Sequence, residues 1–113
     1  MKNILWFKEI SIKDVPIVGG KNASLGEMYS LLTPKGIKVP NGFAVTAEAF
    51  RYFLKYNNLD DKIKELLKDK KLVEDVKRLA VAGKKIREMI LQSSLPKDLV
   101  KDILAAYKEL GNN

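Results

Sequence analysis

The chain has 113 residues and a mass of 12.8 kDa, which is the length of one modest domain with a single hydrophobic core. Hydrophobic residues make up 46% of it and charged residues 31%, a composition typical of a globular protein and not of a disordered one. Cysteine and histidine are both absent, which excludes disulfide scaffolds, nucleophilic thiols, histidine-based triads and metal sites built on these side chains. Any metal would need carboxylate and phosphate oxygens, the ligands that magnesium prefers.

The formal net charge is +7, from 21 basic and 14 acidic residues. The excess is spread along the chain without a basic block, so it favours a solvated surface with some attraction for anions over a nucleic-acid interface. No apolar run is long enough for a signal core or a membrane span. We therefore expect a cytoplasmic protein with neither a nucleic acid nor a membrane as partner.

The first third of the chain is irregular and rich in glycine and proline. Residues 4–7 form a short apolar run that predicts a buried strand, and residues 11–16 are typical of a turn or a single helical turn. Gly19 and Gly20 then interrupt the chain before the first long helix.

That helix is expected to begin near Asn22 or Ala23, because Ser24 and Glu27 have the spacing of a capping box. Residues 33–36, which contain a proline and a glycine, should end it. Its predicted apolar stripe consists of Leu25, Met28, Leu31 and Leu32.

Residues 40–42 predict a turn, and residues 43–45 a second short strand that pairs with residues 4–7. Thr46 is the expected N-cap of the next helix, and Glu48 lies in its first turn, where the helix dipole favours an acidic group. The predicted buried face of this helix is Phe50, Phe53 and Leu54.

Residues from 59 onward have helical periodicity throughout. The first apolar stripe is Leu59, Ile63, Leu66 and Leu67, and the stripe of a longer second helix is Leu72, Val76, Leu79, Ile86 and Ile90. Pro96 suits the first position of a last helix, which ends at Gly111 with the stripe Leu99, Ile103 and Leu110.

These elements predict a helix-rich α+β fold with a small two-stranded β element and about four to five helices. Residues 1–58 form a mixed segment of strands, loops and helices, and residues 59–113 a helical segment. Two short strands do not make a stable sheet by themselves, so further strands should complete it. We therefore expect residues 1–113 to be an incomplete first part of a larger domain.

The stretch that suggests chemistry is Gly19, Gly20, Lys21 and Asn22, directly before the helix. Paired glycines let a ligand approach the backbone closely, and the helix N-terminus offers N–H groups and a positive dipole end to an anion. Lys21 could neutralise a phosphate there, and a nucleoside triphosphate is the natural ligand. The spacing is neither a Walker A motif nor Gly-x-Gly-x-x-Gly, so a purely structural loop with Lys21 in solvent stays open as an alternative.

Other candidate sites have structural explanations. Residues 39–46 are accounted for by a turn that leads into a strand, although they could also shape a nucleotide pocket beside Lys21. The aromatic residues at 50–56 fit a core and its rim better than a base-stacking surface. No pair of carboxylates stands out as a general acid and base, so no catalytic residue and no metal ligand is expected in this chain.

Residues 19–28, GGKNASLGEM, resemble the N-terminus of the phosphoenolpyruvate-utilising dikinases, the family of phosphoenolpyruvate synthase and pyruvate, phosphate dikinase. Trp6 precedes this motif, and Val39-Pro40-x-Gly42-Phe43 and Thr46-Ala47-x-Ala49-Phe50 follow it in the family's order. The resemblance is strong over residues 4–54 and looser over residues 59–110.

This resemblance implies the N-terminal subdomain of an ATP-grasp nucleotide-binding domain. In the family, ATP phosphorylates a histidine on a separate domain, which passes the phosphoryl group to pyruvate; ATP, pyruvate and water become AMP, phosphoenolpyruvate and phosphate, with magnesium. The lysine that contacts the ATP phosphates corresponds to Lys21, with Gly19, Gly20 and Asn22 as loop backbone. Packing by Trp6, Phe43 and Val45 is expected to hold the loop.

The expected partners are therefore ATP and the remaining domains of a parent enzyme, and a dimer is left open. The family's next ATP-binding strand, its magnesium-binding carboxylates, its phosphohistidine and its pyruvate barrel have no counterpart in these 113 residues, which indicates an N-terminal fragment that is inactive alone. The alternative is a stand-alone helical protein-interaction module whose glycine loop is structural.

Overall fold

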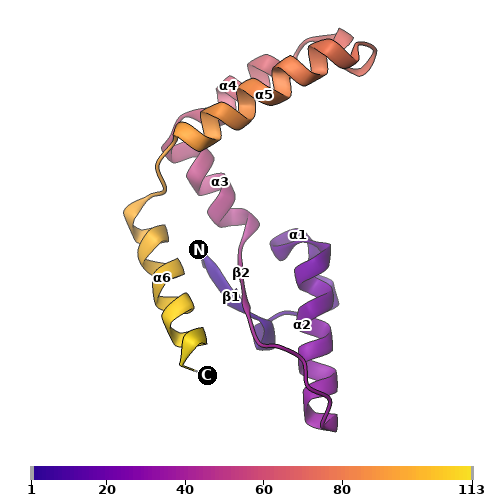
Figure 1. The fold of residues 1–113 in the computed structure, drawn as a ribbon, viewed down its shortest axis with the longest axis vertical. Coiled ribbons are helices and arrows are strands. Elements are labelled where there is room, and N and C mark those ends of the chain that lie inside the picture. The colour runs from indigo at the N-terminus through magenta and orange to yellow at the C-terminus, as the bar shows by residue number, and fades with distance from the viewer. Residues whose placement is uncertain (1, 113) are drawn as a thin grey trace. The chain divides into compact units, whose positions relative to one another are not determined.

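The computed structural model describes residues 2–112, which divide into two compact units (Figure 1). The first unit comprises residues 1–50 and 96–113, and the second comprises residues 51–95. The chain therefore leaves the first unit once and returns to it with its last helix. The boundary of the first unit follows packing, because the last helix packs with the N-terminal elements.

The first unit is built on two short antiparallel strands, β1 (Ile4–Trp6) and β2 (Phe43–Val45). Leu5 lies opposite Ala44 in the register, and the Phe7 N–H donates to the Gly42 carbonyl at 3.0 Å just beyond the pair. The predicted pairing of these strands is confirmed. Since side chains alternate between the two faces, Leu5 and Ala44 share one face of the pair.

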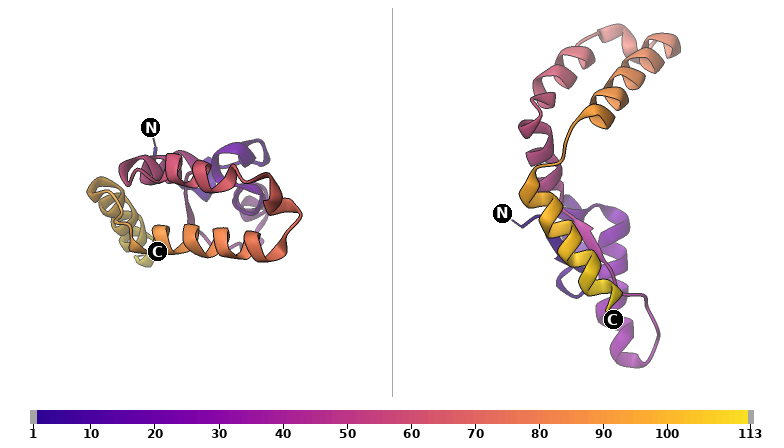
Figure 2. Two further views of the ribbon diagram at one scale, coloured as in Figure 1. Left: turned by 90° about the horizontal axis from the view of Figure 1, so that it is seen from above. Right: turned by 60° about the vertical axis from the view of Figure 1, so that its left-hand side comes forward.

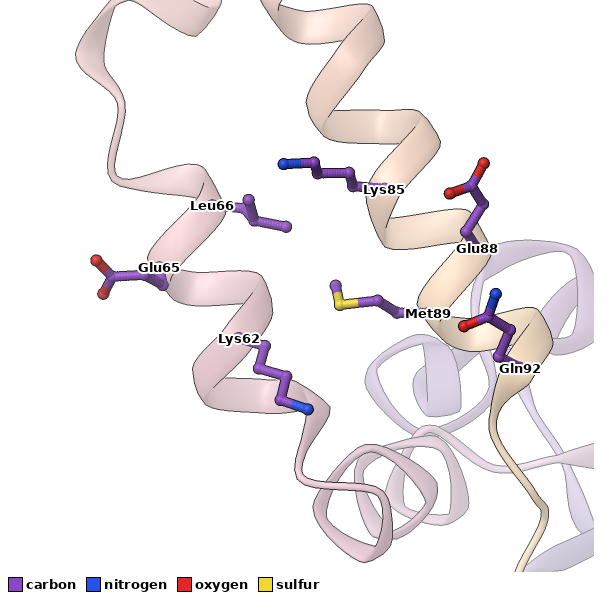
Figure 3. Close-up of a pocket in the computed structure, with 7 residues that line it drawn as sticks. All are labelled: Lys62, Glu65, Leu66, Lys85, Glu88, Met89 and Gln92. Carbon is purple, nitrogen blue, oxygen red and sulfur yellow. The ribbon is translucent and has the colours of Figure 1, made fainter.

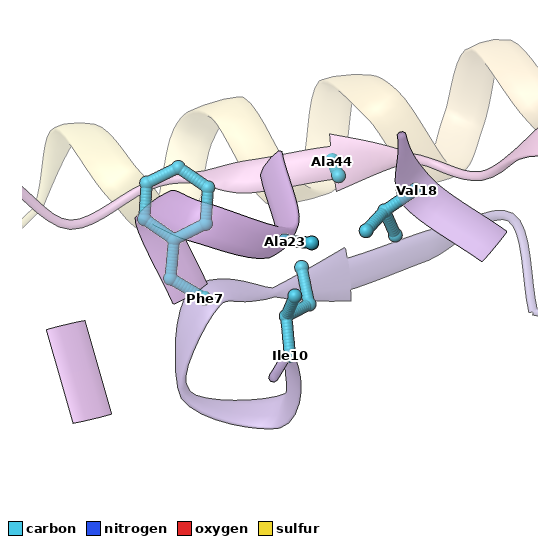
Figure 4. Close-up of a cluster of buried hydrophobic side chains, with 5 residues drawn as sticks. All are labelled: Phe7, Ile10, Val18, Ala23 and Ala44. Atoms are coloured by element: carbon cyan, nitrogen blue, oxygen red, sulfur yellow. The ribbon is translucent and has the colours of Figure 1, made fainter. Parts of the chain in front are cut away.

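That face is covered by α1 (Val15–Val18) and α2 (Gly20–Leu32), with short 3-10 turns at residues 7–9 and 12–14 leading into them. Figure 4 shows side chains from the first 3-10 turn, from Ile10 after it, from α1 and α2 and from β2 gathered together. The resulting hydrophobic core cluster consists of Phe7, Ile10, Val18, Ala23 and Ala44.

Helix α2 packs through its smallest residues. Ala23 and Gly26 are buried, and Leu25 of the predicted stripe is partly buried against the core. Met28 and Leu31 are exposed, so the predicted stripe is wrong for these two residues. A Cβ atom on Gly26 would lie 2.5 Å from Ile10 Cβ, so the helix backbone sits directly against Ile10. Contact with the core requires small side chains at Ala23 and Gly26. Hydrophobic periodicity does not identify a glycine as buried, because glycine has no apolar side chain.

The boundaries of α2 also differ from expectation. The helix begins at Gly20 with Gly19 as N-cap, so the predicted start near residues 22–23 is wrong and Ser24 lies inside the helix, where no capping box forms. Its end is as predicted: residues 33–35 tighten into a 3-10 turn that closes at the left-handed Gly36. Residues 37–42 then run to β2 without the turn expected at residues 40–42.

Thr46 joins the strands to α3 (Ala47–Tyr56). Its hydroxyl donates to the Lys2 carbonyl at 2.8 Å and accepts from the Ala49 N–H at 3.1 Å, which confirms it as the N-cap. The buried residues of α3 are Ala49 and Phe53, whereas Phe50, predicted to be buried, is exposed.

The other face of the strand pair is covered by α6 (Lys97–Gly111), so α2 and α6 lie on opposite sides of it (Figures 1 and 2). Leu99 and Ala106 are the buried residues of α6, and the Asn3 side-chain amide donates to Asp102 Oδ2 at 2.9 Å. Pro96 is the N-cap of this helix, one residue before the first helical position that the sequence predicts for it.

The second unit contains α4 (Leu59–Leu67) and α5 (Val76–Gln92), which lie side by side (Figure 2). Asp75 caps α5 by accepting from the N–H groups of Lys77 and Arg78, so Leu72, predicted within this helix, lies in a 3-10 turn before it. At the other end of the unit, the Asn57 side chain donates to the Ser94 carbonyl and accepts from the Ser94 N–H.

The helix-rich α+β class predicted from the sequence is confirmed. Residues 2–112 contain six α-helices and a two-stranded sheet, where about four to five helices were expected. The additional helix is the single turn α1, whose residues are equally typical of a turn.

We predict that Gly26→Ala lowers the free energy of unfolding by about 1–3 kcal/mol, because the new methyl group overlaps Ile10. Gly83→Ala, inside α5, is the matched control, since its methyl group meets only the flexible end of Arg87 at 3.2 Å. That control should gain up to about 1 kcal/mol from helix propensity. Urea unfolding followed by circular dichroism measures both, and an unchanged Gly26→Ala midpoint contradicts the close packing of α2 against Ile10.

The Glu9 carboxylate accepts the Trp6 N–H at 3.0 Å, which lowers the pKa of Glu9, and Lys2 at 3.2 Å lowers this pKa further. A carboxyl group with a lowered pKa in the folded state stabilises the fold above its unfolded pKa and loses this contribution as the pH falls through the folded value. We therefore predict that Glu9→Gln makes the unfolding free energy less dependent on pH between about pH 5 and pH 3. Urea titrations across this range test it, and an unaltered pH dependence contradicts it.

Candidate functional site

The candidate site lies where α1 meets α2, at residues 19–22. Gly19 has φ 84° and ψ 164°, a backbone region that is essentially restricted to glycine. Its N–H donates to the Val15 carbonyl at 2.8 Å and its carbonyl accepts from the Ala23 N–H at 3.0 Å. Gly19 therefore ends one helix and starts the next, and this backbone geometry explains why a glycine is needed there.

Gly20 has no comparable structural reason to be a glycine. It is the first residue of α2, and a Cβ atom built on it meets nothing within 4 Å. The fold would accept a side chain at this position. Its absence leaves the backbone at the start of α2 open to an approaching group.

Lys21 is exposed in the first turn of α2. Within residues 2–112 its ammonium group has no hydrogen-bond or ion-pair partner. Asn22 is half-buried, and its side-chain amide donates to the Val18 carbonyl at 3.0 Å, so this side chain joins α2 to α1. The four predicted site residues are contiguous, and Asn22 contributes rigidity.

The electrostatics of the segment favour an anion. The first N–H groups of an α-helix lack carbonyl partners within the helix, and the dipole places partial positive charge there. The first turn of α2 contains no acidic residue that would compensate this charge, and Lys21 adds a full one. The carboxyl groups of Glu9 and Asp69 have lowered pKa values. In both cases the main cause is a hydrogen bond from a backbone N–H group outside this segment.

The expectation that Trp6, Phe43 and Val45 hold the loop is wrong. Trp6 and Phe43 face each other in the register with ring centroids 5.5 Å apart, and the alternation of side chains places them on the face opposite Ala44. Leu5 and Ala44 instead contribute to the packing around Val18, which precedes the loop.

Two further glycines hold the segment in place, and periodicity did not reveal their role. Gly26 allows α2 to contact Ile10, and a Cβ atom on Gly42 would lie 2.7 Å from the Phe7 ring. A glycine inside a helical pattern signals such close approach, so the sequence offered this signal for Gly26. At Gly42 the predicted turn already accounted for the glycine, and only the structure shows its packing role.

No group of three or more histidine, cysteine, aspartate or glutamate side chains in the described part of the chain is arranged to hold a metal ion. None of the helices among residues 2–112 combines the length and hydrophobicity needed to cross a membrane.

Comparison with known proteins relates the chain to a family of AMP/ATP-binding domains. The family model described as "Pyruvate phosphate dikinase, AMP/ATP-binding domain" matches residues 15–113, which include the whole of the candidate site. The chain belongs to this family.

Its relatives include the phosphoenolpyruvate synthase of Aquifex aeolicus, 48% identical over 95% of the chain, and that of Neisseria meningitidis, 50% identical over 95%. A probable phosphoenolpyruvate synthase of Methanocaldococcus jannaschii is 47% identical over 97% of the chain. The matches cover 12%, 13% and 9% of these three relatives, so the chain corresponds to a small part of each.

We predict that Gly19→Ala lowers the free energy of unfolding by about 1–3 kcal/mol, because alanine strains the backbone at this φ and ψ. Gly20→Ala, one residue later in open space, should leave it unchanged or raise it by less than about 1 kcal/mol. Urea unfolding of both variants measures this contrast. Equal effects would contradict the distinction between a glycine required by its backbone angles and one that the fold does not require.

Proposed function

We propose that the chain is part of the ATP-binding domain of a phosphoenolpyruvate synthase and that residues 19–22 bind the phosphates of ATP. The observation that carries this proposal is that the matched AMP/ATP-binding family covers a helix N-terminus carrying a lysine without a partner among residues 2–112. The identity of 45–50% to phosphoenolpyruvate synthases supports the choice of enzyme.

Each residue of the segment has a distinct part in this proposal. Gly19 sets the direction of the chain, and Gly20 lets phosphate oxygens approach the first N–H groups of α2. Lys21 supplies a point charge that can donate to a phosphate oxygen from a range of directions. Asn22 keeps the start of α2 fixed against α1 through Val18.

In the whole enzyme, ATP, pyruvate and water would be converted to AMP, phosphoenolpyruvate and phosphate. The chain contains no histidine, so the histidine that carries the phosphoryl group in this proposal belongs to another part of the protein. Lys21 would hold the phosphates in place and stabilise charge that develops on them during transfer. Its role is therefore electrostatic and does not include proton transfer.

Mg²⁺ bound with ATP would neutralise part of the phosphate charge. Residues 2–112 offer no group of three or more acidic side chains arranged to hold the ion, so we propose that its carboxylate ligands lie elsewhere in the enzyme. We also propose a cytoplasmic location, the compartment that supplies pyruvate and ATP.

We predict that Lys21→Ala lowers turnover by about 100-fold or more in an enzyme that contains this segment, as for loss of one positioned electrostatic group. The chain replaces the matched part of the Aquifex aeolicus phosphoenolpyruvate synthase, to which it is 48% identical. Pyruvate-dependent formation of AMP and ATP-dependent phosphorylation of the enzyme are then measured. Lys21→Arg, which retains the charge, should keep more activity than Lys21→Ala.

Lys35→Ala is the matched control, because Lys35 is also exposed and follows the opposite end of α2. This variant should remain within about twofold of the unmodified chimera, since surface charges away from the site contribute little. Near-normal phosphorylation by Lys21→Ala, with circular dichroism unchanged, would contradict the assigned role of Lys21 and leave the family membership intact.

A further inference from the structure

A groove runs between α4 and α5 in the second unit. Two neighbouring cavities of about 400 and 340 Å³ share Leu66 and Lys85 in their walls, and together they are called the α4–α5 groove. Leu66 from α4 and Ala82 and Met89 from α5 provide its apolar surface. In Figure 3, Leu66 and Met89 point toward one another across the gap between the helices.

The charged side chains of the groove are arranged asymmetrically. Figure 3 shows Lys62 and Lys85 reaching toward the gap, whereas Glu65 and Glu88 point away from it. Glu65 pairs with Lys68 at 3.2 Å, so it does not neutralise Lys62. Within the described part of the chain, neither Lys62 nor Lys85 has an ion-pair or hydrogen-bond partner.

The guanidinium group of Arg78, in the wall of the α4–α5 groove, is already neutralised. Arg78 lies 3.0 Å from an Asp69 carboxylate oxygen and 3.6 Å from one of Asp75. The positive charge available to a ligand therefore comes from Lys62 and Lys85, on opposite sides of an apolar floor, and from Lys77 in the wall of the second cavity. A ligand that complements this surface must combine apolar groups with negative charge.

The charge of the whole unit favours the same class of ligand. Residues 51–95 contain twelve lysine and arginine residues and seven aspartate and glutamate residues. We propose that the α4–α5 groove binds an acidic amphipathic helix, whose apolar stripe contacts Leu66 and Met89 and whose carboxylates pair with Lys62 and Lys85. A second copy of the chain is a poorer occupant, because two units with this excess of positive charge repel one another.

The experiment uses the 113-residue chain with methyl-labelled methionine and a synthetic helical peptide of about 18 residues with a leucine stripe flanked by glutamates. The chain has three methionines: Met89 reports on the groove, and Met28 on α2 is an internal control in the other unit. We predict a saturable shift of the Met89 methyl signal and no shift of Met28. Affinity should fall as salt is added, because the lysines are exposed.

Charge reversal then locates the contact. The double variant Lys62→Glu/Lys85→Glu should weaken peptide binding by about tenfold or more. The double variant Lys64→Glu/Lys84→Glu changes the net charge equally on the same two helices but outside the groove lining, and should weaken binding by less than about threefold. Circular dichroism verifies folding, and Lys62→Gln/Lys85→Gln replaces the first variant if that variant unfolds.

Several outcomes would overturn the proposal. Equal losses in the two charge-reversed variants, or equal binding of a peptide with serine in place of leucine, would mean attraction by net charge alone. A Met89 signal that does not respond would exclude the groove. A Met89 shift that follows protein concentration without peptide, together with a dimer in light scattering, would make a second copy the occupant.

Discussion

The close contact between α2 and residues 7–14 is the constraint on which the first unit depends. Ile10 is 2% exposed and lies against a helix surface made of Ala23 and Gly26, where no side chain exceeds one carbon. Such a contact has almost no freedom to slide, because a closely packed interior leaves no space into which either side can move. The start of α2, and with it Lys21, is thereby fixed relative to the strand pair.

The glycines in and around the motif serve different purposes, and separating them shows which residues the fold does not require. Gly19 is required by its backbone conformation, whereas Gly26 and Gly42 are required by side chains that occupy the space where a Cβ atom would be. Within residues 2–112, neither backbone conformation nor packing requires a glycine at position 20, and no interaction requires a lysine at position 21. Both lie within a match to a family of AMP/ATP-binding domains, which supports the proposal that a phosphate uses the open backbone and the available ammonium group there.

Sequence reasoning succeeded where the deciding interaction is local. Thr46 caps α3 through an atom three residues away, and Gly36 ends the helical segment through its own backbone angle. It failed where burial depends on distant partners: Phe50 has the spacing of a core residue but is exposed. The face occupied by Trp6 likewise depends on which side of the strand pair receives α2, and a two-residue period specifies only that neighbouring side chains alternate.

The lysines of the two units illustrate how surroundings give one side chain different binding properties. Lys21 stands beside helix N–H groups in a first turn without acidic residues, so its charge adds to a dipole and suits a compact, highly charged anion such as a phosphate. Lys62 and Lys85 flank Leu66 and Met89, and their charge is coupled to apolar surface that a free phosphate cannot cover. A phosphate at the groove would leave this surface in water, whereas an acidic helix would bury it, so hydrophobic contact gives the groove a preference that charge alone does not supply.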